Sequence, residues 1–216
     1  MGYNKLQKLS DNIEAIRIAF DVERGHVPTE SEKAALSKYS GFGGLKFVLI
    51  PEGPKENWKK QDQPYYEKTQ ELWGLLRGHS ADDAEYRRYV SSIRNSVLTS
   101  FYTPVPVVDA IASSMKKAGL QVSTMLEPSS GSGVFIDVFQ RHFPDLHVTA
   151  FEKDLVTGKV LSARHQEADV HVEGFETIDS SLRGSFDLVV SNIPSSLYVK
   201  AEKPSGNNSY DNESLS

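Results

Sequence analysis

The sequence contains no cysteine, and this absence removes several kinds of site at once. A chain without cysteine forms no disulfide framework and has no thiolate to act as a nucleophile or as a zinc ligand. Its six histidines are scattered along the chain without the spacing of metal-ligand pairs. We therefore predict no metal site.

The start of the chain lacks the long apolar run of a signal peptide or a membrane span. Charged residues interrupt it at Lys5, Lys8, Asp11, Glu14 and Arg17. The sequence thus predicts a cytoplasmic protein with no membrane partner.

Positive charge is also scarce, since 24 Lys and Arg residues stand against 29 Asp and Glu residues, giving a net charge of −5. Non-specific binding to nucleic acid depends on clustered Lys and Arg that neutralise phosphates. The composition argues against a free-standing binder of this kind and leaves room for a local basic surface. The length of 216 residues suits one globular domain with a smaller appendage.

The first hundred residues or so have mainly helical patterns. Leu9, Ile13, Ile16 and Phe20 fall at helical spacing after the possible cap Ser10-Asp11, which predicts a helix from about 10 to 24. Further helices are expected from the capping box at 29–32 as far as Tyr39, before a glycine-rich turn at 41–44, and then over 65–76 and 82–93, with a loop over 51–63.

The pattern changes in the second half of the chain. Thr103-Pro104 is expected to cap and begin a helix that ends at Gly119. The following elements are predicted in order: strand 124–127, helix 134–142, strand 147–151, helix 155–165, a short strand near 169–172 and strand 186–190. This alternation predicts an α/β fold with a parallel, doubly wound sheet. Beyond it, 203–214 has the composition of a disordered tail.

The most informative segment is a glycine turn between a strand and a helix. Glu127-Pro128-Ser129-Ser130-Gly131-Ser132-Gly133 follows the first strand, and Glu152 ends the next strand about twenty residues later. In α/β folds this layout holds a ribose-containing cofactor at the carboxyl edge of the sheet. Glu152 is expected to accept hydrogen bonds from the ribose, and Glu127 to face a cationic part of the ligand. A dinucleotide is disfavoured because Ile136 occupies the place of the third small residue.

Four segments carry distinctive motifs: Phe101-Tyr102-Thr103-Pro104, the segment from Leu126 to Gly133, Phe151-Glu152-Lys153-Asp154 and Ser191-Asn192-Ile193-Pro194. They resemble motifs X, I, II and IV, in the order of the gamma group, of S-adenosylmethionine-dependent adenine-N6 DNA methyltransferases. The helical front end is similar to the amino-terminal region of large methylase-helicase proteins of bacterial mobile elements. The resemblance implies a Rossmann-like class I methyltransferase fold, S-adenosylmethionine as cofactor and DNA as partner.

The resemblance also implies a role for each matching residue. The cofactor-binding residues would be Phe101, Tyr102, Thr103, Pro104, Glu127, Ser129, Gly131, Gly133, Glu152, Lys153, Phe175 and Glu176. Asn192 and the carbonyl of Ile193 would accept hydrogen bonds from the amine of a target adenine, and Pro194 would fix that backbone. These last three residues are the implied catalytic set.

The sequence departs from the family at two places, and both affect the expected catalysis and leave the expected cofactor-binding residues unchanged. Ser195 and Ser196 stand where the family has the aromatic residue that grips the flipped base, which predicts impaired activity. The family fold has further strands after motif IV that have no counterpart here, so we expect a truncated domain of about four strands. Its fourth strand would lie at an exposed edge, where a homodimer is possible.

The sequence therefore predicts three parts: a helical region at 1–98, an incomplete methyltransferase domain at 99–200 and a disordered tail at 201–216. Two other interpretations stay open. One is a non-catalytic remnant of a mobile-element methylase that binds DNA or protein. The other is a protein glutamine N5-methyltransferase, because the Asn-x-Pro motif also occurs in that family.

Overall fold

The computed structural model describes residues 4–50, 52–99 and 103–193. Its helices are α1 (Lys5–Glu23), α2 (Glu30–Leu36), α3 (Tyr66–His79), α4 (Asp83–Thr99), α5 (Val105–Lys117), α6 (Val134–His142) and α7 (Leu155–Arg164). Its strands are β1 (Thr124–Glu127), β2 (His147–Phe151), β3 (Asp169–His171) and β4 (Leu188–Val189). Short 3-10 turns lie at Lys46–Leu49, Lys55–Asn57, Gln63–Tyr65, Phe175–Thr177 and Ser180–Leu182. None of the helices in the described ranges has the length and hydropathy that crossing a bilayer requires.

The four strands form one parallel sheet in the order β3-β2-β1-β4. Met125 in β1 lies between Val148 of β2 and Leu188 of β4. Because parallel strands end at the same edge of a sheet, Glu127 at the end of β1 and Glu152 just after β2 come to one edge. The structure confirms a mixed α/β chain with a parallel sheet and is compatible with a Rossmann-like fold.

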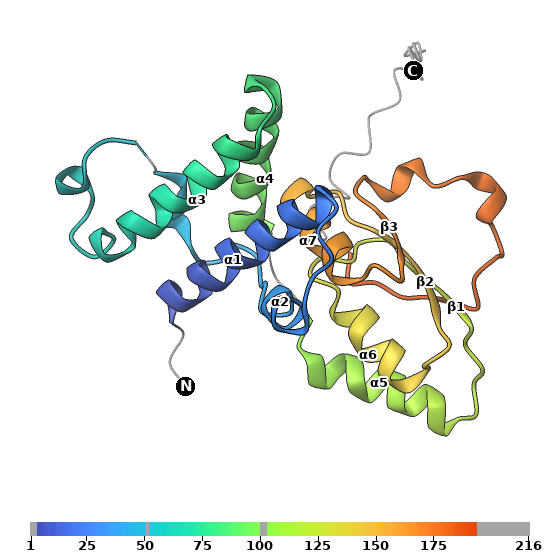
Figure 1. Cartoon of the computed structure of the whole chain (residues 1–216). Coiled ribbons are helices and arrows are strands. Elements are labelled where there is room, and N and C mark those ends of the chain that lie inside the picture. Colours follow the sequence, from blue (N-terminus) through green and yellow to red (C-terminus); the bar gives the residue numbers. More distant parts are fainter. Residues whose placement is uncertain (1–3, 51, 100–102, 194–216) are drawn as a thin grey trace, which may run out of the picture.

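Helices α5, α6 and α7 share a hydrophobic core with the sheet (Figure 1). Val108 and Ala112 of α5, Ile136 and Phe139 of α6, and Met125 of β1 are all fully buried in it. The apolar residues of α6 recur at helical spacing, so one face of the helix packs against the strands.

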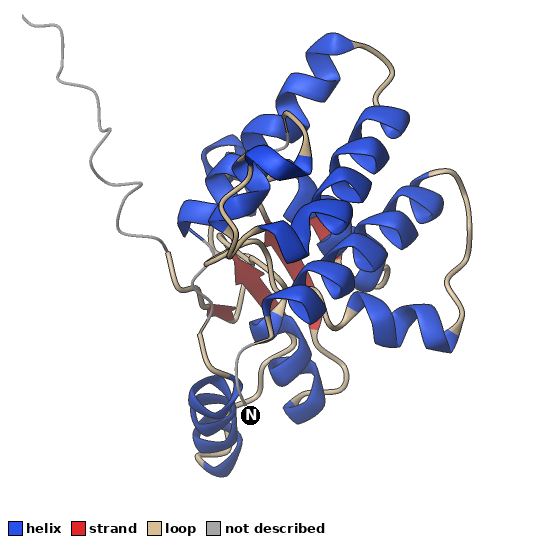
Figure 2. Cartoon of the chain, turned by 90° about the vertical axis from the view of Figure 1, so that its left-hand side faces the viewer, coloured by secondary structure: helices blue, strands red, loops and turns tan. Residues whose placement is uncertain are grey.

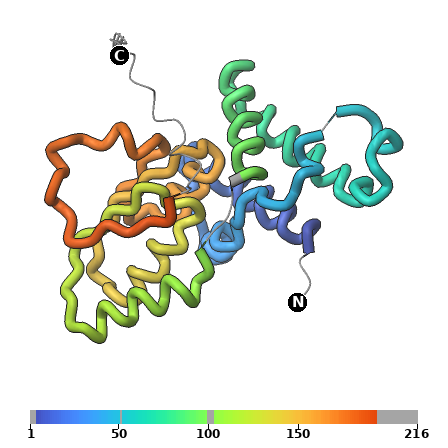
Figure 3. The backbone as a smooth tube through the Cα atoms, turned by 180° about the vertical axis from the view of Figure 1, so that it is seen from behind, coloured from blue at the N-terminus to red at the C-terminus, as the bar shows by residue number. Residues whose placement is uncertain are grey.

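A long connection links the two edge strands. Because β3 and β4 lie at opposite edges, the connecting segment has to cross the sheet, and Figure 3 shows it from behind. It contains 3-10 turns instead of an α-helix. Strand β4 is shorter than the expected 186–190, and Val189 in it is 60% exposed. As expected, β4 lies at an edge of the described sheet, and a dimer through that edge stays a prediction.

The helical region packs on α7, which thereby belongs to two hydrophobic cores. Val156, Val160 and Ala163 of α7 join a buried cluster with Phe20 of α1 and Tyr89 of α4. Leu161, on another side of α7, packs in the core of the sheet. Figure 1 shows α7 between the N-terminal helices and the strands, and Figure 2 shows the strands lying among the helices. The helical region is therefore anchored to the element that follows Glu152.

Four helices differ from the predicted ranges by at least three residues at one end: α3 and α4 extend to His79 and Thr99, beyond the expected 76 and 93. The limits of α1 and α2 differ because of specific polar contacts. Helix α1 begins at Lys5, since the Asn4 side chain accepts hydrogen bonds from the N–H groups of Leu6 and Gln7 and caps it. Helix α2 ends at Leu36 and not at Tyr39. The next residues are drawn onto α1, where the buried Asn12 accepts from Ser40 N and donates to Gly41 O.

Two mid-helix glycines predict opposite effects of one substitution. A Cβ at Gly158 in α7 would lie 2.5 Å from Cγ1 of Val172, whereas a Cβ at Gly74 in α3 would have no neighbour within 4 Å. We expect Gly158→Ala to lower the free energy of unfolding by about 1–3 kcal/mol through overpacking. Gly74→Ala should raise it by about 0.5–1 kcal/mol through helix propensity. Urea denaturation measures both, and a stabilising Gly158→Ala would contradict the packing of α7 on β3.

Candidate cofactor site

A tight turn joins β1 to α6. Gly131 and Gly133 have φ angles of 55° and 85°, which are left-handed conformations that favour glycine. The Ser130 N–H donates to the carbonyl of Phe151 at 2.9 Å, and the Ser130 hydroxyl donates to the carbonyl of Glu127 at 3.1 Å. The turn is thus fixed both to its own strand and to the end of β2.

Glu152 lies against this turn. Its Oε2 accepts a hydrogen bond from Gly131 N at 2.7 Å, and its Oε1 accepts one from Asp154 N at 2.7 Å. The side chain is 9% exposed, and burial raises its pKa to about 7, opposed by the two backbone hydrogen bonds. A carboxylate offers about four lone-pair sites, so roughly two are left for further donors.

Glu127 is the most deeply buried acid of the site. It is fully buried, and neither of its carboxyl oxygens has a hydrogen-bond partner among the described residues. Burial, followed by the charge of Glu152, raises its pKa well above the usual range. Two neighbouring acids that are disfavoured as anions create a site where a cation would be stabilised.

The turn is braced from the side of α7. Arg164 donates to the carbonyl of Ser132 at 2.8 Å and forms an ion pair with Asp137 of α6. His165 packs on Gly133 so closely that a Cβ there would lie 2.6 Å from its Nε2. Burial lowers the pKa of His165, so a neutral ring fills this space at neutral pH. The second glycine is therefore required by the packing of His165 as well as by its φ angle.

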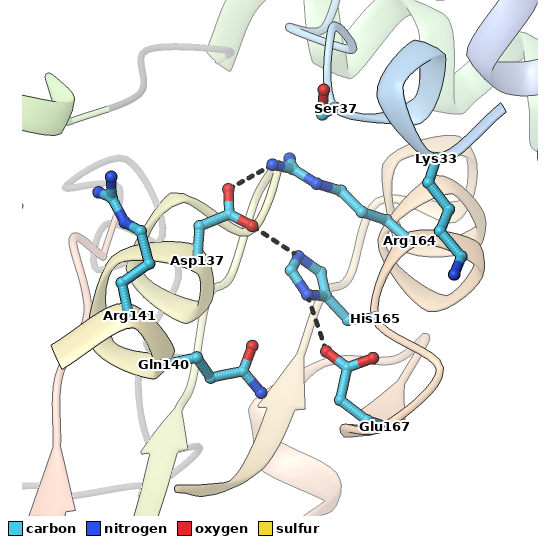
Figure 4. A pocket seen from close by; sticks show the side chains of 8 residues that line it. All are labelled: Lys33, Ser37, Asp137, Gln140, Arg141, Arg164, His165 and Glu167. Atoms are coloured by element: carbon cyan, nitrogen blue, oxygen red, sulfur yellow. Dashed lines mark hydrogen bonds and ion pairs between the residues drawn. The ribbon is translucent and has the colours of Figure 1, made fainter. Parts of the chain in front are cut away.

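Asp137, Arg164 and His165 also line a pocket of about 440 Å³. Figure 4 shows Asp137 between Arg164 and His165. The pocket is lined by Lys33, Ser37, Asp137, Gln140, Arg141, Arg164, His165 and Glu167. None of these is a predicted cofactor residue, and the cationic side chains have acidic neighbours: Lys33 pairs with Glu30, Arg141 with Asp109 and Arg164 with Asp137. The pocket lies beside the turn as part of its support.

The predicted residues near β3 lie at the surface. Lys153 Nζ donates to Glu176 Oε1 at 2.7 Å, and this hydrogen bond lowers the pKa of Glu176. Both side chains are more than 60% exposed, so the pair contributes little stability. Phe175 packs edge-on against Phe151 with ring centroids 5.5 Å apart.

The predicted residues of the first and last motifs also meet. Asn192 Nδ2 donates to Thr103 Oγ1 at 3.0 Å, across 89 residues of sequence. Thr103 therefore does not cap α5 as expected, and Pro104 occupies the N-cap position without a side-chain hydrogen bond. With its amide nitrogen held by Thr103, Asn192 is oriented so that Oδ1 can accept from another group.

The structure thus joins Gly131 to Glu152, Lys153 to Glu176 and Thr103 to Asn192. Ser129 lies half-buried in the turn, and Ile193 is 41% exposed. Phe101, Tyr102 and Pro194 lie outside the described residues. The sequence reasoning missed Arg164 and His165, for which no local signal exists. It also missed Asp154, whose place three residues before Thr157 is typical of an N-cap.

Comparison with known proteins gives one partial likeness. Over 98 residues, or 45% of its length, the chain is 35% identical to Defense against restriction protein B of Escherichia phage P1. The chain spans about 4% of the length of that relative. No protein-family model and no solved structure matches the present chain.

Glu127 predicts a pH-dependent cost of folding in the ligand-free protein. A carboxyl whose pKa is raised in the folded state binds more protons when folded, so stability falls as pH rises above the unfolded pKa. Glu127→Gln should therefore raise the free energy of unfolding at pH 8, by about 1–3 kcal/mol, and this gain should vanish towards pH 4. Denaturation at both pH values measures it. Glu173→Gln, at an exposed acid after β3, is the control, and an equal gain at the two pH values would refute the assignment.

Proposed function

We propose that the chain is an S-adenosylmethionine-binding domain of the DNA adenine-N6 methyltransferase type. The observation that carries the proposal is the Gly131–Glu152 hydrogen bond beside the buried Glu127, whose carboxyl oxygens have no hydrogen-bond partner among the described residues. A ligand with a ribose and a positive charge matches both acids. S-Adenosylmethionine has a ribose, an ammonium group and a sulfonium centre, whereas a dinucleotide brings a negative pyrophosphate.

The described residues supply distinct parts of such a site. Glu152 would accept hydrogen bonds from ribose hydroxyls through the lone pairs that Gly131 and Asp154 leave open. Glu127 would stabilise the positive charge electrostatically. Phe175 and Glu176 would lie at the adenine end, and Ser129 and Gly133 would shape the turn. Lys153 acts through its ion pair with Glu176.

Asn192 is the residue proposed to act on the substrate. Its Oδ1 and the carbonyl of Ile193 would accept hydrogen bonds from an adenine amine, directing the nitrogen lone pair at the methyl donor. When bound, S-adenosylmethionine supplies the electrophilic methyl group. Alignment of the two reacting atoms is most of the catalytic task, so no base with an unusual pKa is needed.

The phage relative supports the context of this proposal. Its name refers to defence against restriction, and its source is a phage. We infer that the chain belongs to a mobile-element system of this kind, with DNA as its partner.

Ser195 favours a second candidate, a non-catalytic remnant that binds DNA or protein. The position after Asn192-Ile193-Pro194 lacks the aromatic residue that would stack on a flipped base. In such a remnant the cofactor site would persist while turnover is lost, and pairing through the edge of β4 would give a homodimer. A glutamine methyltransferase fits less well, because the helical region and the Thr103 motif resemble the DNA enzymes.

Glu152→Ala tests the cofactor site. Calorimetry should detect binding of S-adenosylmethionine to the wild type that strengthens as pH rises through about 7, because Glu152 must ionise to accept both hydroxyls. The variant should bind at least about tenfold more weakly, as expected for the loss of hydrogen bonds to a charged acceptor. Glu173→Ala should bind normally. Unchanged affinity in Glu152→Ala would refute the proposed pocket.

Ser195→Phe tests the substrate side. Stacking on an aromatic side chain contributes roughly 1–3 kcal/mol per base, so this variant should raise methyl transfer to adenine-containing DNA by about ten- to a hundredfold. Transfer of a labelled methyl group measures the rate, and Ser195→Ala is the control. If the wild type and Ser195→Phe both bind the cofactor and neither transfers a methyl group to DNA, the non-catalytic alternative is favoured.

A further inference from the structure

A serine of the helical region reaches the segment that carries Glu152. Ser92 in α4 is 4% exposed. Its hydroxyl donates to Asp154 Oδ2 at 2.8 Å and accepts from Val156 N at 3.0 Å. These contacts join residues more than 60 positions apart in the sequence. The Ser92 hydroxyl is therefore both donor and acceptor to the residues at the start of α7.

Asp154 connects this serine to the acid of the cofactor site. Its Oδ1 accepts from Thr157 N at 2.9 Å, which caps α7, while its own N–H donates to Glu152 Oε1 at 2.7 Å. Ser92 thus fixes the Asp154 side chain, and the Asp154 backbone fixes Glu152. The chain of hydrogen bonds continues from Glu152 to Gly131 in the glycine turn.

A second contact from the helical region supports the same turn of α7. The hydroxyl groups of Tyr39 and Thr157 lie 3.0 Å apart in a buried position. Tyr39 lies in the segment after α2, so two separate parts of the helical region converge on residues 154–157. Asp154 is half-buried, and burial raises its pKa, whereas the hydrogen bonds from Thr157 and Ser92 favour its ionised form.

We propose that the helical region is a working part of the cofactor site and that Ser92 is its positioning residue. Through Asp154, Ser92 sets the position of Glu152 for the ribose. The inference rests on the proposed function, because it assigns Glu152 to that ligand group. It gives the front end of the chain a role beyond covering α7.

The chain offers a matched control for this role. Ser96 lies one turn further along α4 and is also 4% exposed, and its hydroxyl accepts a hydrogen bond from Phe42 N at 3.1 Å, within the helical region. Ser92→Ala and Ser96→Ala remove the same hydroxyl group from the same helix. Asp154→Asn is a second test, because it keeps an oxygen for the cap of α7 and replaces the acceptor of Ser92.

Hydrogen exchange in the ligand-free protein gives a readout that does not depend on the cofactor. In Ser92→Ala and Asp154→Asn, the amides of Gly131 and Asp154 should exchange roughly tenfold faster relative to amides in the middle of β2, which report global unfolding. In Ser96→Ala these two amides should keep the wild-type ratio, while Phe42 exchanges faster. Unchanged ratios for Gly131 and Asp154 in Ser92→Ala would overturn the proposal.

Calorimetry with S-adenosylmethionine completes the test. Ser92→Ala should bind roughly tenfold more weakly than the wild type, and Ser96→Ala should bind like the wild type. Equal affinity of Ser92→Ala and the wild type would overturn the role of Ser92 in the site. If the exchange ratios change as expected and the wild type does not bind, the proposed cofactor is wrong while the coupling of Ser92 to Glu152 stands.

Discussion

The Glu152 carboxylate, with a backbone N–H group bound to each of its oxygens, is the contact that connects the parts of this molecule. Gly131 N brings the glycine turn after β1 to the end of β2, and Asp154 N brings the start of α7 to the same point. Because α7 belongs to both hydrophobic cores, a displacement of Glu152 would disturb the packing of the sheet and of the helical region. The acid thus has a structural role in addition to the role proposed for it in the site.

Burying two acids at this point lowers the free energy of unfolding, so stability of the fold is no reason for their presence. Neither carboxyl oxygen of Glu127 has a hydrogen-bond partner among the described residues, and a buried charged or polar group without a partner destabilises the folded state. Glu152 offsets part of its cost through two backbone donors, and Glu127 does so only by taking up a proton. Such groups are typical of ligand sites, where the missing partner is supplied by the ligand.

The local patterns of the sequence were sufficient for the elements that position the site. Alternating apolar runs and the glycine turn predicted β1, α6, β2 and α7 within one or two residues, because the signals lie within each segment. The placement of the glycine turn and Glu152 at one edge of the sheet follows from the rule that parallel strands end together, whereas the hydrogen bond from Gly131 to Glu152 was not predicted. The two-residue length of β4 did not follow, since the extent of an edge strand depends on its neighbours.

Contacts between distant segments were beyond the reach of sequence patterns. Ser92 looks like any polar residue on a helix, and its hydrogen bond to Asp154 spans 62 positions. The same holds for His165, whose ring explains why Gly133 tolerates no side chain. Hydrophobic periodicity predicts which face of a helix is buried, but it does not say what the face contacts.

The two sides of the proposed site differ in burial and in the number of hydrogen bonds that hold their side chains. On the cofactor side, Glu127 and Glu152 are buried, and hydrogen bonds from three separate segments converge on Glu152 and Asp154. On the substrate side, Asn192 is exposed, and its side chain is held by the hydrogen bond to Thr103. A buried network resists substitution because each lost bond leaves an unsatisfied group, whereas an exposed bond is replaced by water at little cost. Substitution at Asn192 or Ser195 is therefore expected to affect the proposed methyl transfer while the two acids and the glycine turn stay intact, so the proposed cofactor site is the part that the buried contacts hold in place.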